Sequence, residues 1–285
     1  MQNATLGILL TILAGITLAS MDSLGKFLGQ HYPVMQVVWS RYFFHALLVV
    51  VILLARGHRG FLRSRRPGLQ AARSVTLLAV SLLIYTALIR IPLADATAVM
   101  FFAPVLVTLM SGLLLSERVT RVRILAVLAG FIGVLLIVRP GLHSDWYMLL
   151  PLAAALMLTT YLLLTRALAG SDDNTTTLFY TTAPGAVLLT LMLPLFWQMP
   201  ETPHLFLMLA TGALGALGHG LIVAAFAFAP ASVLSPFLYS QILAAMVISL
   251  LIFGDPLTAL MLAGTALLVG GGLSVWWAES RKADA

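Results

Sequence analysis

Ionisable side chains that interrupt long apolar stretches are the first candidates for chemistry in this sequence. Asp22, Arg41, His45 and His219 each lie within such a stretch. A charge at the centre of a membrane helix costs roughly 2.5–3.5 kcal/mol on insertion scales, so such residues are functional candidates by default. Asp22 precedes Lys26 by four residues, the order that favours an ion pair along a helix. If Lys26 reaches the outer surface, this pair is structural; otherwise Asp22 faces a cavity, where it binds a cationic group or accepts a proton.

Arg41 and His45 are also four residues apart. Because an arginine does not lose its charge in a protein, Arg41 needs a carboxylate, carbonyl groups or water around it. We expect it to bind a substrate carboxylate or to pair with Asp22, and a position at the membrane surface or a fold-stabilising contact is the alternative. His45 has two equally suitable roles: it could carry a proton, or it could form a hydrogen bond between helices. His219 lies between Gly218 and Gly220, where bare backbone leaves room for its ring, and its simpler role is also a hydrogen bond to a neighbouring helix.

Hydroxyl and aromatic side chains complete the candidate site. Three pairs with a spacing of four residues each share one helix face: Ser81 with Tyr85, Thr97 with Phe101, and Ser235 with Tyr239. An apolar cavity with a few polar groups suits an amphipathic metabolite. Core packing is the alternative for each of the aromatic residues. The predicted substrate-binding residues are Asp22, Trp39, Arg41, His45, Ser81, Tyr85, Thr97, Phe101, Tyr161, Tyr180, His219, Ser235 and Tyr239.

The elements that must position these residues are membrane-spanning helices. Hydrophobic residues make up 61% of the 285 residues, charged residues make up 9%, and mean hydropathy is +1.03. Soluble domains carry about 25% charged residues. The apolar runs are about as long as a helix that crosses the bilayer, and roughly twice as long as a strand of a membrane barrel. They cover residues 6–28, 34–54, 70–89, 94–115, 121–138, 146–168, 176–197, 204–227, 231–253 and 257–277.

The basic residues predict how these ten spans are oriented. Lys and Arg are enriched in the cytoplasmic loops of membrane proteins. The segments on the side of the N-terminus hold twelve Lys and Arg residues, and those on the other side hold three. We therefore predict a multi-pass protein of the cell (inner) membrane with both termini in the cytoplasm. Small residues three or four apart in the spans near 121–138, 204–227 and 257–277 also predict close helix packing.

The second half of the chain repeats the first. With an offset of 138 residues and no gap, Glu117 aligns with Asp255 and Thr120 with Thr258, so the same acid-and-threonine turn joins two helices in each copy. Each copy holds five spans, an odd number, so the second copy enters the membrane from the opposite side. The predicted fold is an all-α integral membrane protein with ten transmembrane helices in two inverted five-helix repeats, 7–140 and 145–277. Inverted repeats are typical of secondary transporters.

Several other classes of protein lack support in the sequence. There is no cysteine, so thiolate catalysis and zinc–thiolate sites are excluded. The motifs H-E-x-x-H, G-x-S-x-G and G-x-x-x-x-G-K-[ST] do not occur. We expect no enzymatic activity, no cofactor, no metal site and no nucleic-acid partner, and we keep an intramembrane enzyme and a non-transport membrane protein as the rival classes.

Three segments of the sequence resemble a known family. They are Trp39–Ser40–Arg41–Tyr42, the run from Pro92 through Pro104 to Arg118, and APASVLSPFLYSQ at 229–241. Together they resemble the EamA group of the drug/metabolite transporter superfamily, over nearly the whole chain and in both copies. The second copy departs from the pattern, with Ile242 in place of the proline and Asp255–Pro256 in place of Glu-Arg.

The resemblance implies a ten-helix inverted-repeat fold with a central cavity. It also implies transport of a small metabolite by alternating access, coupled to protons, to a counter-substrate or to neither. Family members are similar to carriers of amino acids and their derivatives, S-adenosylmethionine, riboflavin and opine-type metallophores. We expect export of an amphipathic amino-acid derivative or similar metabolite. The alternative is an importer of a vitamin or nucleoside-like metabolite of the riboflavin or S-adenosylmethionine type.

Overall fold

The computed structural model describes residues 4–58, 60–114, 121–139, 146–168, 171–229 and 231–283. This part of the chain is made of helices joined by short connections, and it contains no strand. The long helices are α1 (Ala4–Gly29), α2 (Val34–Ala55), α3 (Pro67–Leu88), α7 (Leu149–Leu168), α8 (Asn174–Met192), α9 (Thr202–Ala225) and α12 (Ala259–Ala283). The shorter ones are α4 (Leu93–Met100), α5 (Phe102–Leu114), α6 (Arg121–Val138), α10 (Ala231–Leu234) and α11 (Ser240–Phe253). Short 3₁₀ turns are η1 (Gly60–Leu62), η2 (Trp146–Met148), η3 (Leu193–Leu195) and η4 (Ser235–Tyr239).

Most of these helices have the length and composition of membrane spans. Within the described residues, eight helical segments are long and apolar enough to cross a membrane, and two shorter apolar helices cover Leu93–Val107 and Ile124–Val138. Many large apolar side chains are exposed on the outside of the bundle, where lipid would cover them. The prediction of an all-helical protein with membrane-spanning helices is therefore confirmed.

Two of the predicted spans are interrupted near their middle. The first breaks at Phe101, between α4 and α5, and the second passes from α10 through η4 into α11. Pro104 lies in the first turn of α5, and Pro236 in the first turn of η4. Proline favours the first turn of a new helix because its fixed φ suits a helix and its missing N–H is not needed there. Each proline therefore helps a new helical segment begin inside the span.

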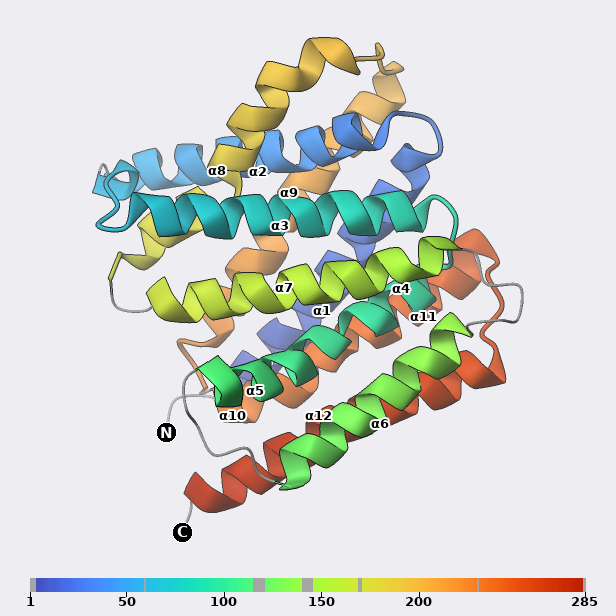
Figure 1. The fold of residues 1–285 in the computed structure, drawn as a ribbon. Coiled ribbons are helices and arrows are strands. Elements are labelled where there is room, and N and C mark those ends of the chain that lie inside the picture. The colour runs from blue at the N-terminus through green and yellow to red at the C-terminus, as the bar shows by residue number, and fades with distance from the viewer. Residues whose placement is uncertain are drawn as a thin grey trace.

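The helices form one bundle in which distant segments lie side by side (Figure 1). Helix α1 packs against α9 and α11, α2 against α8 and α9, α3 against α7 and α8, and α6 against α12. The start of α1 and the end of α12 lie toward the same end of the bundle (Figure 1). This arrangement surrounds a central region with helices from both halves of the chain.

Small residues bring several helix backbones close together, as the sequence predicts. A Cβ added to Gly133 in α6 would lie 2.6 Å from the carbonyl oxygen of Gly264 in α12. A Cβ added to Gly212 in α9 would lie 2.8 Å from the backbone nitrogen of His45 in α2. Real Cβ atoms do not approach other atoms this closely, so glycine is required at both contacts.

Candidate functional site

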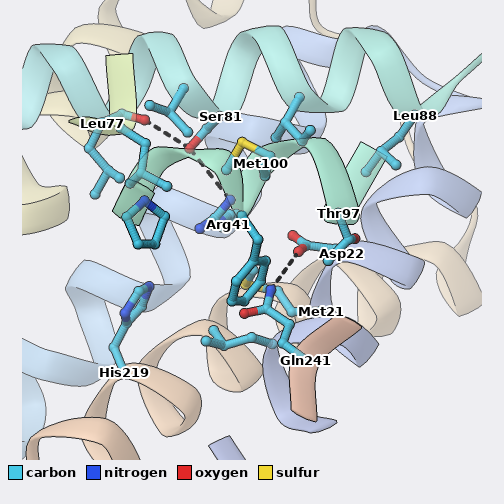
Figure 2. Close-up of a pocket in the computed structure, with 16 residues that line it drawn as sticks. Met21, Asp22, Arg41, Leu77, Ser81, Leu88, Thr97, Met100, His219 and Gln241 are labelled. Atoms are coloured by element: carbon cyan, nitrogen blue, oxygen red, sulfur yellow. Dashed lines mark hydrogen bonds between the residues drawn. The ribbon is translucent and has the colours of Figure 1, made fainter. Parts of the chain in front are cut away.

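A central cavity of about 190 Å³ lies between helices of both halves. Its wall is mostly apolar, with a small number of polar side chains directed into it (Figure 2). The predicted residues that line it are Asp22, Arg41, Ser81, Thr97, Phe101 and His219. The other lining residues are Leu18, Met21, Leu77, Val80, Ile84, Leu88, Met100, Pro104, Leu158 and Gln241.

Arg41 is the main cation of the cavity. Its Nη1 donates one long hydrogen bond, 3.4 Å, to the hydroxyl of Ser81. Its guanidinium carbon lies 5.5 Å from the ring centre of Tyr85 and 6.0 Å from that of Tyr42, so two aromatic faces stabilise the charge. Within the described residues no carboxylate lies within ion-pair distance of Arg41. The guanidinium therefore has donors available for an anionic group in the cavity.

Ser81 holds the guanidinium in place through a short chain of hydroxyl groups. The hydroxyl of Ser81 donates to the backbone carbonyl of Leu77 at 3.0 Å, and it lies 3.0 Å from the hydroxyl of Tyr42. Tyr85 is fully buried, and its ring lies beside the guanidinium of Arg41. Tyr42 was not among the predicted site residues, although it directly follows Arg41 in the sequence.

Asp22 is the acid of the cavity, and its partner differs from the predicted one. The amide Nε2 of Gln241, on α11, donates to Oδ2 of Asp22 at 3.5 Å. Of the two alternatives for Asp22, the ion pair with Lys26 is not formed, since Nζ of Lys26 lies 2.9 Å from Oδ2 of Asp255, and Asp22 faces the cavity. Lys26 also donates to the carbonyl of Ile91 at 3.1 Å.

The surroundings of Lys26 explain this correction. Lys26 lies at the end of α1, where Asp255, Ile91 and the ring of Phe253, 4.6 Å away, all face its ammonium group. A buried ammonium group is best stabilised where several partners surround it. Asp22 would have supplied one partner, whereas the end of the bundle supplies three. Asp22 is thereby left to face the cavity together with Arg41, without a direct ion pair between the two (Figure 2).

The two predicted histidines are neighbours. His219 lines the cavity, and the centre of its ring lies 5.8 Å from that of His45. His45 is buried behind it, and its Nε2 has no hydrogen-bond partner. The pair thus reaches from the cavity wall into the contact between α2 and α9.

The aromatic residues at the two interrupted spans contact each other. The rings of Phe101 and Tyr239 are 5.5 Å apart, centre to centre. Thr97 and Phe101 line the cavity, whereas Ser235 and Tyr239, both in η4, lie outside its lining.

Three predicted residues contact other parts of the bundle instead of the cavity. The indole of Trp39 stacks on Phe43 and donates to the hydroxyl of Thr190 at 2.9 Å. The hydroxyl of Tyr161 accepts a hydrogen bond from Arg73, and that of Tyr180 donates to the backbone of Leu62. The aromatic character of these residues alone did not show whether they pack within the bundle or line the cavity.

Two polar residues of the interior were not singled out from the sequence. Gln241 contacts Asp22 in the cavity, and Arg73 lies in the bundle between α3, α7 and α8. Arg73 could have been found by the rule used for Arg41, because it lies within an apolar run, whereas Gln241 is not ionisable and falls outside that rule.

Arg73 is enclosed by oxygen atoms of uncharged groups. It donates to the hydroxyls of Thr165, Tyr161 and Thr181 at 2.7, 2.7 and 3.0 Å. It also donates to the backbone carbonyl of Thr177 at 3.2 Å and to the side-chain oxygen of Gln70 at 3.4 Å. Since a guanidinium has five N–H donors, these bonds use all of them.

Comparison with known proteins identifies relatives along the full chain. A family model described as the EamA-like transporter family matches residues 5–139 and, separately, residues 145–277. The chain is 27% identical to a riboflavin transporter of Vibrio cholerae over 92% of this chain and 90% of that one. It is 27% identical to a pseudopaline exporter of Pseudomonas aeruginosa over 92% and 93% of the two chains. It is 21% identical to an S-adenosylmethionine uptake transporter of Rickettsia bellii over 99% and 97%.

A solved crystal structure also has a similar fold. It is 20% identical in sequence, covers 98% of each chain and superimposes with a TM-score of 0.67. The likeness extends the sequence relationship to the arrangement of the helices.

Proposed function

We propose, from the premise that this chain belongs to the EamA-like transporter family, that it carries a small zwitterionic and partly apolar metabolite across the cytoplasmic membrane by alternating access. That the protein is a membrane transporter of small molecules follows from the family and from relatives that are named as transporters. The expected resemblance to this family is confirmed. The substrate class, the direction and the coupling are our proposals.

The observation that carries the substrate class is the separation of two opposite charges in one apolar cavity. Arg41 offers unused donors for a carboxylate, and Asp22, held by one long bond from Gln241, offers oxygens for an ammonium group. Each charge costs free energy while it is unpaired in a low-dielectric cavity. A zwitterion would neutralise both, and the apolar wall would contact its side chain. An amino-acid derivative fits this description.

Local symmetry supports the proposed inverted repeat. Gly133 meets the carbonyl oxygen of Gly264, and Gly271 meets that of Ala126. The offset of 138 residues converts the first contact into the second, because it relates Gly133 to Gly271 and Ala126 to Gly264. The two contacts are therefore exchanged by a twofold operation between α6 and α12. The same offset relates Phe101 to Tyr239, whose rings meet each other.

The helix pairings support the same arrangement. If α1 corresponds to α7 and α3 to α9, exchange of the halves turns the pairing of α1 with α9 into that of α7 with α3. It likewise turns the pairing of α2 with α9 into that of α8 with α3. The eight long apolar segments and the two shorter apolar helices together match the ten proposed spans, divided between units 7–140 and 145–277. In such a fold, rocking of the halves opens a central cavity alternately to each side.

We place both termini in the cytoplasm. They lie toward the same end of the bundle, and the loops at that end carry the excess of Lys and Arg. We propose the inner membrane of a bacterium as the location, in line with the bacterial relatives.

We propose that Asp22, rather than His45 or His219, carries any coupled proton. Asp22 is the acid that lines the cavity, whereas His45 is buried behind the cavity wall. Asp22 faces the cavity and would release its proton when a substrate ammonium group arrives. Replacement of Asp22 by Asn should then remove the pH dependence of transport, while replacement of either histidine by Gln should retain it. An unchanged pH profile in Asp22→Asn, with transport intact, would refute coupling through this residue.

The second candidate function is uptake of a vitamin-like or nucleoside-like metabolite. Two of the relatives named above are a riboflavin transporter and an S-adenosylmethionine uptake transporter, whereas another is an exporter. S-Adenosylmethionine ends in an amino-acid zwitterion, so the same pair of charges would suit it. We favour export of an amino-acid derivative, and the direction of net transport decides between export and uptake.

The test is flux through purified protein in proteoliposomes. Pools of amino acids, amino-acid derivatives, S-adenosylmethionine, flavins, nucleosides and opine-type chelators are loaded on one side, and the solute on the other side is identified chemically. We expect an unaltered zwitterion to cross, and Arg41→Ala to reduce this flux by at least about 10-fold. Arg121→Ala, at an exposed position outside the cavity, is the matched control. Recovery of a chemically altered product would favour an intramembrane enzyme, and absence of any flux would favour a non-transport role.

A further inference from the structure

The connection between α2 and α3 carries a cluster of exposed arginines. Arg56, Arg63, Arg65 and Arg66 are exposed there, and segment 56–66 contains no acidic residue. Leu62 is exposed among them, with 59% of its surface accessible. We call these four arginines and Leu62 the arginine platform. Within the described residues, none of the four guanidinium groups forms an ion pair.

The platform lies at the level where the lipid-facing surface of α2 ends. Val51, Ile52 and Leu54 are exposed apolar residues of the last turns of α2, and Arg56 follows one residue after the helix. Because α2 spans the membrane, this position corresponds to the boundary between the hydrocarbon and the head groups. A cationic cluster beside an exposed leucine suits this boundary.

An apolar anchor fixes the platform to the bundle. Phe61 is 4% exposed and packs against Val49 and Leu53 of α2. Its ring centre lies 5.1 Å from that of Phe179 in α8. Residues 60–66 are therefore a folded part of the bundle, on which Arg63, Arg65 and Arg66 are exposed.

A polar anchor fixes the other half of the platform. Asp172, in the turn between α7 and α8, accepts hydrogen bonds from the hydroxyl of Ser64 at 2.5 Å and from the backbone N–H of Arg65 at 2.7 Å. It also accepts one from the side-chain amide of Gln70 at 2.9 Å, and the hydroxyl of Tyr180 donates to the carbonyl of Leu62 at 3.1 Å. Asp172 thus binds the backbone and neighbouring polar groups of the platform. This use of the carboxylate leaves the guanidinium groups available.

We propose that the arginine platform is a preformed binding site for the phosphate of an anionic glycerophospholipid. Arginine binds phosphate oxygens through two parallel N–H bonds, which requires a defined geometry. The platform places four exposed arginines at the head-group level, and the exposed side chain of Leu62 would contact the acyl chains. The site is independent of the transport cavity and of its substrate.

The substitution Asp172→Asn distinguishes a preformed site from a general attraction of positive charge to the membrane. Asp172→Asn makes the region more positive by one charge, so a purely electrostatic attraction would become stronger. A preformed site would become weaker, because the side chain of Ser64 and the backbone of Arg65 lose their anionic acceptor. The two explanations predict opposite signs for one substitution.

The experiment measures lipid selectivity in nanodiscs. The full-length protein is placed in discs of phosphatidylcholine with or without phosphatidylglycerol, and the lipids it retains are counted by native mass spectrometry. We expect the wild-type protein to retain phosphatidylglycerol selectively. We expect the triple variant Arg63→Gln/Arg65→Gln/Arg66→Gln to lose about 100-fold in affinity for it, at roughly tenfold or less per arginine. Arg121→Gln should retain the selectivity, because it removes an exposed arginine outside the platform.

The anchor variants complete the test. Asp172→Asn and Ser64→Ala should each reduce phosphatidylglycerol retention several-fold with all four arginines intact. Circular dichroism and the thermal midpoint in phosphatidylcholine check that the bundle is folded. Equal or stronger retention by Asp172→Asn would overturn a preformed site in favour of unspecific attraction. Unchanged retention by the triple variant would exclude the platform altogether.

Discussion

Arg41 and Arg73 are both arginines in the interior of the helix bundle, on the neighbouring helices α2 and α3, yet their surroundings differ. Arg73 uses five N–H donors on five oxygen atoms, all of them belonging to uncharged groups. Arg41 donates one long hydrogen bond, 3.4 Å, to the hydroxyl of Ser81 and faces the cavity. Neither forms an ion pair within the described residues. The state of the donors, rather than the charge, distinguishes the two sites.

This difference assigns different roles to two residues of the same type. A guanidinium with all donors occupied connects α3, α7 and α8 and has no donor left for a ligand. A guanidinium with free donors in a cavity costs free energy until an anion arrives. Arg73 is therefore expected to contribute mainly to stability and Arg41 mainly to binding.

The largest expected effect is on stability. Arg73→Ala removes five hydrogen bonds and leaves the hydroxyls of Thr165, Tyr161 and Thr181 to find other partners. We expect it to lower the unfolding free energy by about 2–4 kcal/mol. Hydrogen bonds to a charged group contribute more than those between neutral groups, but hydrogen bonds inside a membrane contribute less than their number suggests. Thermal unfolding in detergent measures this loss. Arg73→Lys, with three donors, should restore only part of it, and an unchanged midpoint in both variants would contradict the structural role.

The second effect is on binding. Arg41→Ala should weaken binding of a carboxylate-bearing substrate by about 10–100-fold, which corresponds to roughly 1.4–2.8 kcal/mol. The midpoint of the ligand-free protein should stay the same or rise, because an unpaired charge in the interior is removed. Titration of the purified variant with ligand measures the loss of affinity, and thermal unfolding measures the midpoint of the ligand-free protein. A large loss of stability without ligand would place Arg41 in the same structural role as Arg73.

Lys26 provides an intermediate case, since its ammonium group has an acidic partner in Asp255. Lys26→Met alone should cost about 1–2 kcal/mol, because the partly buried carboxylate of Asp255 loses its partner while keeping the hydroxyl of Ser249 at 2.8 Å. The double variant Lys26→Met/Asp255→Asn should recover part of this loss. A double-mutant cycle on the unfolding free energy measures the coupling, and strictly additive losses would exclude a stabilising pair.

The smallest effect concerns Asp172, a surface acid that accepts three hydrogen bonds, whereas Arg73 donates five. Hydrogen bonds from Ser64 and Gln70 hold the pKa of Asp172 below its usual range. Because the pKa is lower in the folded state, the stabilisation provided by the ionised carboxylate of Asp172 is fully present above the unfolded pKa of about 3.9. It is lost as pH falls through the lower folded value. We expect hydrogen exchange at the amide of Arg65 to stay protected between pH 7 and about 4 and to increase below that. Asp172→Asn should remove this pH dependence, and a transition near neutral pH in the wild-type protein would contradict the assignment.

The sequence predicted the elements better than their contacts. The length of the apolar runs depends only on local composition, and the described helices follow them closely. The interruption at Phe101 agrees with proline chemistry, but the presence of Pro104 and Pro236 does not by itself determine where the spans break. Those positions depend on how each new segment packs.

The polar residues were found by type, but their partners were not. Six of the predicted residues line the cavity: Asp22, Arg41, Ser81, Thr97, Phe101 and His219. Lys26 was paired with Asp22 because the rule for helices considers only residues on the same helix, whereas Asp255 comes from a turn more than two hundred residues away. Trp39 and Tyr161 contact Thr190 and Arg73 because of how their helices are rotated, which composition does not determine.

The central claim is that Arg41 binds the carboxylate of the transported metabolite. The most direct measurement compares the thermal stabilisation of purified wild-type, Arg41→Ala and Arg121→Ala proteins by the metabolites selected from the pools, each tested as the free acid and as its methyl ester. We predict that the free acid stabilises wild-type and Arg121→Ala, and that stabilisation is lost in the ester and in Arg41→Ala. A ligand that stabilises wild-type and Arg41→Ala equally, with no difference between acid and ester, would contradict the claim.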